Sequence, residues 1–263
     1  MLEIISMDLF TRIYGEGKPI IILHGLFGIS DNWVTFARMM SAGYKIFLPD
    51  LRNHGQSPHS SVMNYQSMAE DLREFISSHN IVDPIIIGHS MGGKVAMKFA
   101  LEYPEIPEIL IIIDISTRAY AIRNTHLDVS GAMLSVDFDS ISTRKEIEDQ
   151  IGSMINDPKI QLFILKNLYR PNSSRFSWRS NIEAITENLD YLTEGITSKK
   201  QFGKPVLFVR GGESDYITDD DITPISTLFP EFQLETIENA SHWIQADTPI
   251  RLHEIISRFI LEN

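Results

Sequence analysis

The chain has 263 residues, a net charge of −12 and no cysteine, and its residues are 43% hydrophobic and 22% charged. This composition is that of an ordinary globular protein, and the length fits one large domain with an insertion or two small domains, of which we favour the first. The acidic balance argues against binding of a phosphate backbone, so we expect no nucleic-acid partner. The absence of cysteine excludes disulfides, thiolate metal sites and cysteine nucleophiles.

The first residues of the chain show no basic segment followed by an apolar core, which a secretory signal would have. No apolar run approaches the ~18 residues that a membrane-spanning helix needs. We therefore expect neither export nor a membrane span, and we expect a cytoplasmic location, which a chain without cysteine permits.

The first part of the chain alternates predicted strands with predicted helices. A weakly alternating segment at residues 9–14 and a turn cluster at 15–19 suggest a hairpin-like start. Apolar runs predict buried strands at residues 20–23, 44–48, 85–87 and 109–113, and apolar residues at helical spacing predict helices from Ser30 or Asp31 to Met40, over 65–79 and over 94–103. This alternation predicts an α/β fold with right-handed crossovers and a parallel sheet covered by helices on both faces.

The alternation stops after Asp114. From about residue 116 to 204 no comparable strand run occurs, and helix signals replace it: a capping box at Thr143 and Glu146, a helix start at Asp157-Pro158, and Ser177 as the cap of a helix over 178–192. We therefore predict a core domain of residues 1–115 and 205–263, interrupted by a helical insertion at 116–204. We interpret Phe138, Phe163, Tyr169 and Trp178 of the insertion as packing residues, with one or two of them facing substrate.

The last part of the chain returns to the core pattern. Residues 205–209 predict a buried strand, residues 232–237 an edge strand, and residues 249–261 a closing amphipathic helix. The acidic run from Asp219 to Asp221 lacks the spaced ligands and the glycine of a calcium loop. We interpret it as a solvated helix start and expect no metal.

A Gly-His-Ser-Met-Gly sequence at residues 88–92 joins the predicted strand at 85–87 to the predicted helix behind it. So sharp a turn needs Gly88 and Gly92, because side chains there would collide, and it lifts Ser90 off the sheet. The strand before the motif and the helix after it make the signal specific. We therefore predict that Ser90 is a nucleophile at a nucleophile elbow.

A serine hydroxyl needs a base, and His242 is the best candidate. It lies between the last predicted strand and the last predicted helix, and it completes the chain order serine, acid, histidine of hydrolases with this layout. His24 and His89 adjoin backbone turns, so they line the site or fill space. The other histidines fit less well.

The oxyanion that forms when a serine attacks a carbonyl needs two N–H donors. The residue after the nucleophile, Met91, should supply one of them. The second should come from the loop His24-Gly-Leu-Phe-Gly28, where our first choice is Leu26 and our second is Phe27. The same glycines would suit a simple connector between strand and helix, so the loop alone does not decide.

Two aspartates could orient the histidine. Asp114 ends the predicted strand at 109–113, and Asp215 follows the predicted strand at 205–209. Both satisfy the chain order, and a carboxylate at either place could hold the imidazole tautomer. Spacing along the chain leaves the two open.

The chain resembles α/β-hydrolases, and among them the bacterial YbfF-type esterases and their mitochondrial relatives. The resemblance rests on residues 24–28, 50–59, 88–93, 114–116, 210–214 and 239–243. It implies an α/β-hydrolase fold with a mostly parallel central sheet, flanking helices and a helical cap. It also implies that Asp114 is the acid and that Ser214 lies near His242. This chain departs from the pattern by carrying Asp215 beside that serine, so a second acid stays open.

These residues together predict a serine carboxylesterase that hydrolyses small to medium acyl esters through an acyl-enzyme, without metal or cofactor. The partner is a small-molecule ester or thioester. The alternatives are an acyl-CoA thioesterase, a carbon–carbon hydrolase, a perhydrolase, or a ligand-binding protein that keeps the fold. A serine at the elbow argues against epoxide hydrolases and haloalkane dehalogenases, which use a carboxylate there. We interpret the Asp50 to Ser57 loop as architecture near the site rather than catalytic machinery.

Overall fold

A seven-stranded sheet forms the centre of the protein, whose computed structural model describes residues 7–171 and 175–263. In chain order its strands are β1 (Thr11–Tyr14), β2 (Lys18–Leu23), β3 (Tyr44–Pro49), β4 (Ile85–His89), β5 (Ile109–Ile113), β8 (Val206–Gly211) and β9 (Phe232–Ile237). In space the order is β1-β3-β2-β4-β5-β8-β9, and every neighbouring pair is parallel except β1 and β3. The predicted α/β fold with a mostly parallel sheet is confirmed.

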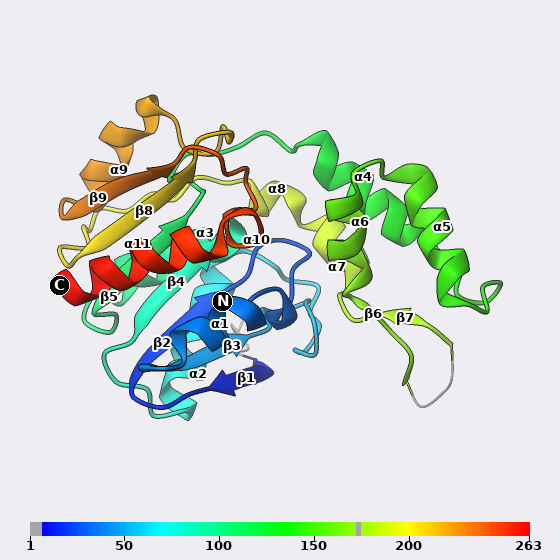
Figure 1. Cartoon of the computed structure of the whole chain (residues 1–263), viewed down its shortest axis with the longest axis horizontal. Helices are drawn as coiled ribbons and strands as arrows, with labels where there is room; N and C mark the ends of the chain where they lie inside the picture. Colours follow the sequence, from blue (N-terminus) through cyan, green and yellow to red (C-terminus); the bar gives the residue numbers. More distant parts are fainter. Residues whose placement is uncertain (1–6, 172–174) are drawn as a thin grey trace.

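Helices cover both faces of the sheet, as Figure 1 shows. They are α1 (Val34–Met40), α2 (Tyr65–Ser78), α3 (Met91–Glu102), α9 (Ile222–Leu228), α10 (Ile244–Asp247) and α11 (Pro249–Glu262), with the single turns η1 (Ser30–Asn32) and η3 (Asp219–Asp221). Side chains from α1 and α11 belong to one buried cluster, and side chains from α2, α3 and α9 belong to the other.

Successive residues of the central strands pack alternately into these two clusters. Ile85 and Ile87 of β4 pack on the side of α1 and α11, whereas Ile86 between them packs on the side of α2 and α3. All five residues of β4 and of β5 are buried. An uninterrupted run of apolar residues is therefore what a strand covered on both faces requires. This burial explains why the apolar runs identified these strands.

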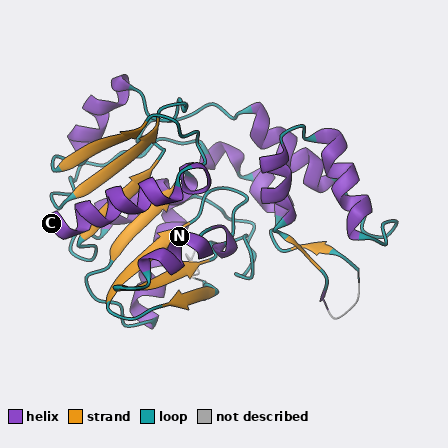
Figure 2. Cartoon of the chain, in the orientation of Figure 1, coloured by secondary structure: helices purple, strands orange, loops and turns teal. Residues whose placement is uncertain are grey.

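The chain between β5 and β8 is mostly helical and lies to one side of the sheet (Figure 2). Its elements are α4 (Asn124–Leu134), α5 (Arg144–Met154), α6 (Pro158–Leu165), β6 (Leu168–Tyr169), β7 (Ser177–Trp178), α7 (Ile182–Glu187) and α8 (Leu189–Leu192). The predicted capping box at Thr143 and Glu146 and the predicted helix start at Asp157-Pro158 are confirmed. We call residues 116–204 the insertion, and their division from the core stays a prediction.

The chain enters and leaves the insertion at one place. Residues 117–120 and 193–196 run side by side, joined by backbone hydrogen bonds of 2.7 and 2.8 Å. Lys94 of α3 is buried, and its ammonium donates to the carbonyl oxygens of Arg118 and Glu194. A single side chain of the core thus binds both connections.

The predicted hairpin-like start is wrong, because β1 pairs with β3 and not with the strand that follows it. The turn between β1 and β2 contains Gly15 and Gly17, both with positive φ. A Cβ atom at Gly15 would lie 2.4 Å from the carbonyl oxygen of Tyr44, so the turn presses directly on the start of β3. The chain can therefore cross β3, and β1 reaches its far edge.

Two predicted helix starts are also wrong. Neither Ser30 nor Asp31 caps α1: these residues form η1, and α1 begins at Val34 after Trp33. Ser177 does not cap a helix over residues 178–192, because Ser177–Trp178 pairs with β6. The helix begins later, at Ile182, and the side chain of Asn181 caps it.

The acidic run at Asp219 to Asp221 differs from its prediction at one residue. The side chain of Asp219 is 82% exposed, as a solvated helix start requires. Asp221 is buried instead, and its carboxylate accepts a hydrogen bond of 2.7 Å from Ser116 Oγ and pairs with Arg118. This residue therefore ties η3 to the chain just after β5.

Candidate active site

Ser90 occupies the turn between β4 and α3 in a conformation that non-glycine residues rarely adopt, with φ 52° and ψ −119°. Its N–H donates to the carbonyl oxygen of Ile113 at the end of β5 (3.0 Å). A Cβ atom at Gly88 would lie 2.3 Å from the carbonyl oxygen of Gly92. The turn is therefore closed only because glycine occupies position 88, as the elbow motif predicts.

The structure brings Ser90, His242 and Asp114 into one chain of hydrogen bonds. His242 Nε2 lies 3.1 Å from Ser90 Oγ, and His242 Nδ1 lies 2.8 Å from Asp114 Oδ2. The ring of Tyr216 stacks on the imidazole of His242, with centroids 3.8 Å apart. His89 packs against the imidazole at 4.8 Å and donates from Nε2 to the carbonyl oxygen of His242 (2.8 Å). Contacts of this kind hold the imidazole in place.

Asp114 follows β5 directly, is fully buried and has a positive φ of 48°. Its Oδ1 accepts a hydrogen bond from Gly211 N–H (2.9 Å), and its Oδ2 accepts hydrogen bonds from Ser214 Oγ and His242 Nδ1. A buried carboxylate needs such donors to remain charged. Asp114 and Ser214 were both expected near His242. Ser214 contacts Asp114, and Asp114 contacts His242.

Asp215 lies elsewhere. Its side chain is 73% exposed, and its carboxylate pairs with Arg123 Nη2 at 2.8 Å. The hydrogen bond from Arg123 lowers the pKa of Asp215. In the part of the chain that the structure describes, Asp215 makes no hydrogen bond to His242, so the geometry does not support it as the partner of the histidine.

The loop at residues 24–28 approaches Ser90 closely. A Cβ atom at Gly25 would lie 3.3 Å from Ser90 Cβ, so only a residue without a side chain fits comfortably. Among the described residues, the N–H groups of Leu26 and Met91 have no hydrogen-bond partner. The N–H of Phe27, our second choice, donates to His54 Nε2 (3.1 Å). Leu26 and Met91 therefore keep the free N–H groups beside Ser90.

Two buried histidines hold this loop. His54 Nδ1 donates to the carbonyl oxygen of Arg52 (2.9 Å), which leaves Nε2 free to accept from Phe27. His24 Nε2 accepts from Leu51 N–H (2.9 Å). Burial lowers the pKa of His24 to about 4 and that of His54 to about 3. Both rings are therefore neutral near pH 7, as their acceptor roles require.

The contacts of the Asp50 to Ser57 loop agree with its interpretation as architecture near the site. Asp50 accepts from Ser30 N–H (2.6 Å) and from Gln56 N–H (2.9 Å), and a Cβ atom at Gly55 would lie 2.0 Å from its carboxylate. Arg52 and Asp71 form a fully buried ion pair with an N–O distance of 2.6 Å. What the sequence did not predict is the bond from His54 to the loop at residues 24–28, since no local pattern relates the two segments.

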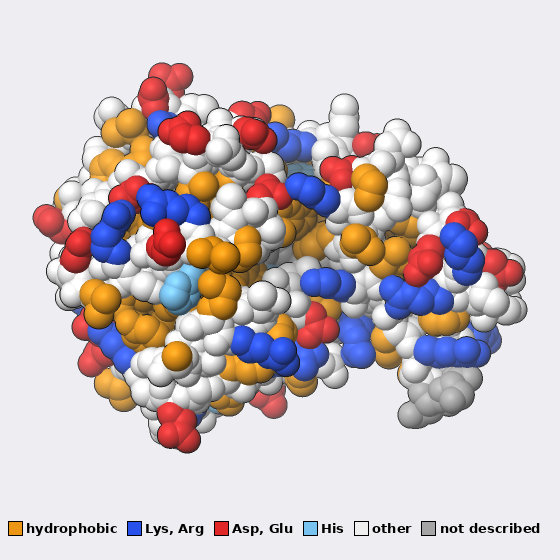
Figure 3. Space-filling view, viewed as in Figure 1, with side chains coloured by type: hydrophobic (Ala, Val, Ile, Leu, Met, Phe, Trp, Pro, Cys, Tyr) orange, Lys and Arg blue, Asp and Glu red, His pale blue; other side chains and the backbone are white. Residues whose placement is uncertain are grey.

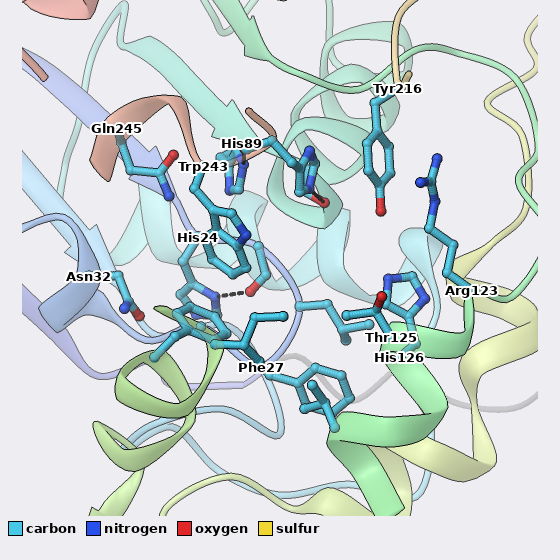
Figure 4. A pocket seen from close by; sticks show the side chains of 18 of the residues that line it. His24, Phe27, Asn32, His89, Arg123, Thr125, His126, Tyr216, Trp243 and Gln245 are labelled. Carbon is cyan, nitrogen blue, oxygen red and sulfur yellow. Dashed lines mark hydrogen bonds between the residues drawn. The ribbon is translucent and has the colours of Figure 1, made fainter. Parts of the chain in front are cut away.

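A cavity of about 240 Å³ opens above Ser90 and His242. Figure 3 shows a recess between the core and the insertion with hydrophobic side chains in it, and Figure 4 shows the pocket from close by. Arg123, Thr125 and His126 line it from the insertion, opposite Trp243 and Gln245 of the core.

Of the four aromatic residues of the insertion considered above, Phe163 lines this cavity, with its ring against that of Trp243 at 4.4 Å. Phe138 and Trp178 pack on each other at 5.5 Å instead. The interpretation of these residues as mostly packing, with one or two facing substrate, agrees with this arrangement. Arg123 and His126 escaped prediction because the sequence pattern of the insertion does not show which of its side chains point toward the core.

Residues 18–249 match a protein family described as having the alpha/beta hydrolase fold. The chain belongs to the α/β-hydrolase family. It is 36% identical over 252 residues to the sn-1-specific diacylglycerol lipase ABHD11 of Danio rerio, covering 94% of this chain and 79% of that protein. It is 30% identical over 245 residues to esterase YbfF of Escherichia coli, covering 93% and 94% of the two chains.

Among solved structures, this α/β-hydrolase is similar to a marine microorganism esterase, with a TM-score of 0.94 and 42% identity. The match covers 97% of this chain and 100% of the other. The resemblance to YbfF-type esterases is thereby confirmed, and the protein is a hydrolase.

Two further observations concern metals and membranes. Within residues 7–171 and 175–263, no cluster of three or more histidine, aspartate or glutamate side chains is arranged to hold a metal ion. In the same residues, no helix combines the length and the apolar character that crossing a bilayer demands. The cytoplasmic location stays a prediction.

Proposed function

We propose that this α/β-hydrolase is a serine carboxylesterase in which Ser90 is the nucleophile, His242 the general base and acid, and Asp114 the residue that orients the imidazole. The observation that carries the proposal is the continuous hydrogen-bond chain from Ser90 Oγ through His242 to Asp114 beneath a cavity. The separation of 3.1 Å between Ser90 Oγ and His242 Nε2 is short enough for direct proton transfer.

In the first step, Ser90 Oγ attacks the carbonyl carbon of the ester while its proton moves to His242 Nε2. The carbonyl oxygen becomes an oxyanion and accepts hydrogen bonds from the N–H groups of Leu26 and Met91. Asp114 stabilises the imidazolium through Nδ1–H. When the tetrahedral intermediate collapses, the bond from carbon to the alcohol oxygen breaks, and His242 donates its proton to that oxygen.

In the second step, water attacks the acyl carbon of the ester formed on Ser90. His242 takes a proton from that water, and the second intermediate collapses by breaking the bond from carbon to Ser90 Oγ. The proton on His242 returns to Ser90. The products are a carboxylic acid and an alcohol, and the cycle uses only side chains and backbone groups of this chain.

The size and the lining of the cavity suit small to medium acyl groups. Its volume is about 240 Å³, and its apolar walls include Leu26, Val129 and Phe163. We propose that the insertion over residues 116–204 acts as a cap on the core formed by 1–115 and 205–263, and that its side chains select the acyl group.

The test is hydrolysis of p-nitrophenyl butyrate together with labelling by a fluorophosphonate. Ser90→Ala should lower kcat by ~10⁶-fold, and it should abolish labelling, because only an activated serine reacts with the probe. Ser226→Ala, at a half-buried serine of α9 whose hydroxyl donates to the carbonyl oxygen of Thr223 (2.9 Å), should retain both. Near-normal turnover by Ser90→Ala would disprove the mechanism. A wild-type protein that the probe does not label would favour a ligand-binding protein instead.

A further inference from the structure

Asn167 connects the insertion to the loop that carries Leu26. It lies between α6 and β6 and is fully buried. Its Nδ2 donates to the carbonyl oxygen of Phe27 over 2.8 Å, across 140 positions of sequence. The steps of the proposed mechanism do not involve Asn167.

The amide of Asn167 is fixed in its orientation. Its Oδ1 accepts a hydrogen bond of 2.7 Å from the hydroxyl of Ser180, which is buried as well. Its backbone carbonyl accepts from Arg179 N–H (2.9 Å), so the backbone of Asn167 is bound to the residue that follows β7. With its oxygen satisfied by Ser180, the amide presents its NH₂ group to Phe27.

Phe27 needs such partners. Its φ of 58° lies in the left-handed region, which an aromatic residue adopts only where its surroundings hold it. The core binds its N–H through His54, and the insertion binds its carbonyl oxygen through Asn167. Both polar backbone groups of one strained residue are thus held, one from each side.

The strained residue directly follows Leu26. Gly25 and Gly28 flank these two positions, and glycine gives a loop many alternative conformations. The direction of the Leu26 N–H therefore depends on the contacts that hold Phe27. The carbonyl oxygen of Gly25 accepts hydrogen bonds from Gly28 N–H (3.0 Å) and from His24 Nδ1 (2.9 Å), and neither bond holds Phe27 itself.

We propose that Asn167 is a positioning residue, which holds Phe27 from the insertion so that the N–H of Leu26 points at the oxyanion formed on Ser90. This inference rests on the proposed esterase mechanism. It makes the contact between insertion and core a determinant of the chemical step, and not of substrate binding alone.

The test is Asn167→Asp, which keeps the shape of the side chain and its acceptor for Ser180 but places a carboxylate against the carbonyl oxygen of Phe27. Since losing one oxyanion donor costs ~10²- to 10³-fold, misdirecting it should lower kcat for p-nitrophenyl butyrate by roughly 10- to 100-fold. The KM should change by less than about threefold, because Asn167 itself does not line the cavity.

Asn188→Asp is the matched control. Asn188 is also a buried asparagine of the insertion, and its Nδ2 donates to a carbonyl oxygen of the core, that of Ser61 (2.9 Å). Neither Asn188 nor Ser61 lines the cavity above Ser90, so kcat should stay within about twofold of wild type. Equal losses of kcat in both variants would mean that any damaged contact between insertion and core slows the enzyme, and would overturn the proposal.

Two measurements separate positioning from partial unfolding. Active-site titration with a fluorophosphonate counts competent serines, so kcat is expressed per reactive site. Affinity for an alkylboronic acid, which forms a tetrahedral adduct on the serine, should fall in Asn167→Asp in proportion to kcat/KM. Unchanged boronate affinity would contradict the role assigned to Asn167.

Ser180→Ala is a second variant that keeps the test decisive if Asn167→Asp does not fold. It removes only the hydroxyl that orients the amide, and kcat should fall several-fold at constant KM. If Ser180→Ala and Asn167→Asp both fold and keep the wild-type kcat, the inference about Asn167 is refuted. The esterase mechanism would still hold in that case, provided that Ser90→Ala is inactive. An active Ser90→Ala would instead refute the mechanism itself.

Discussion

The carboxylate of Asp114 lies 2.8 Å from His242 Nδ1 although 128 positions separate the two residues in the chain. The relationship arises because β5 ends at the same edge of the sheet at which the loop after β9 begins. The parallel strands therefore bring the two segments to one edge of the sheet.

Asp114→Asn should lower kcat by ~10⁴-fold, because an amide leaves the imidazole without its anionic partner and favours the wrong tautomer. Asp215→Asn is the matched control, since its carboxylate pairs with Arg123 at the protein surface. It should cost no more than a few-fold. Steady-state hydrolysis of p-nitrophenyl butyrate measures both, and a larger loss in Asp215→Asn would reverse the assignment of the acid.

Arg52→Met should destabilise the fold by about 3–5 kcal/mol, because it leaves the buried carboxylate of Asp71 without its cation. Urea unfolding measures the loss. The double variant Arg52→Met/Asp71→Leu should recover much of it, since no unpaired charge remains. Arg258→Met removes an exposed partner of Glu235 and should leave the urea midpoint nearly unchanged. A double variant less stable than Arg52→Met would contradict the explanation.

Acid should destabilise the protein through its buried histidines. Burial lowers the pKa of His54 and His89 to about 3 and that of His24 to about 4, from 6.5. Below pH 6.5 the unfolded chain takes up protons on these rings and the folded chain does not, so the free energy of unfolding falls as the pH drops toward 4. Between pH 7.5 and 5 each histidine accounts for at most about 2 kcal/mol.

His54→Gln isolates one of these contributions. The variant should be less stable than wild type at pH 7.5, because the acceptor for Phe27 N–H is disturbed. Its stability should nevertheless fall less steeply between pH 7.5 and 5, because one titrating group is gone. Urea unfolding at several pH values gives both slopes, and identical slopes would show that unfolding does not change the pKa of His54.

Phe163→Ala should shift the preference toward longer acyl chains, because it removes a ring from the cavity wall. Each additional methylene that finds apolar space there should improve kcat/KM by up to about tenfold relative to wild type. A series of p-nitrophenyl esters of increasing chain length measures the shift. Phe138→Ala, whose ring packs on Trp178, should leave the profile as it is. The same shift in both variants would mean that the cavity wall does not select the acyl group.

The elements best predicted from the sequence are those for which one local pattern suffices. The isoleucine run of β5 is buried on both faces, and no amphipathic alternative exists for it. The turn at Ser90 needs glycine at fixed positions on both sides, so its motif and its geometry are the same constraint.

The features that sequence could not predict depend on contacts between distant segments. Asp114 and Asp215 are equally well placed along the chain, and what separates them is the turn that brings Gly211 and Ser214 to Asp114 and the position of Arg123 in the insertion. The pairing of β1 with β3 likewise depends on a turn pressed against Tyr44. No periodicity within either segment records these contacts.

Lys94 holds the two ends of the insertion together through contacts that involve no residue from the middle of the insertion. For a loop whose ends already meet, each doubling of its length costs only about 0.6 kcal/mol of closure entropy. We therefore expect that a different insertion can replace residues 116–204 while the nucleophile elbow, His242 and the sheet stay unchanged. Such a replacement needs its own donor for the carbonyl oxygen of Phe27, which is the role proposed for Asn167.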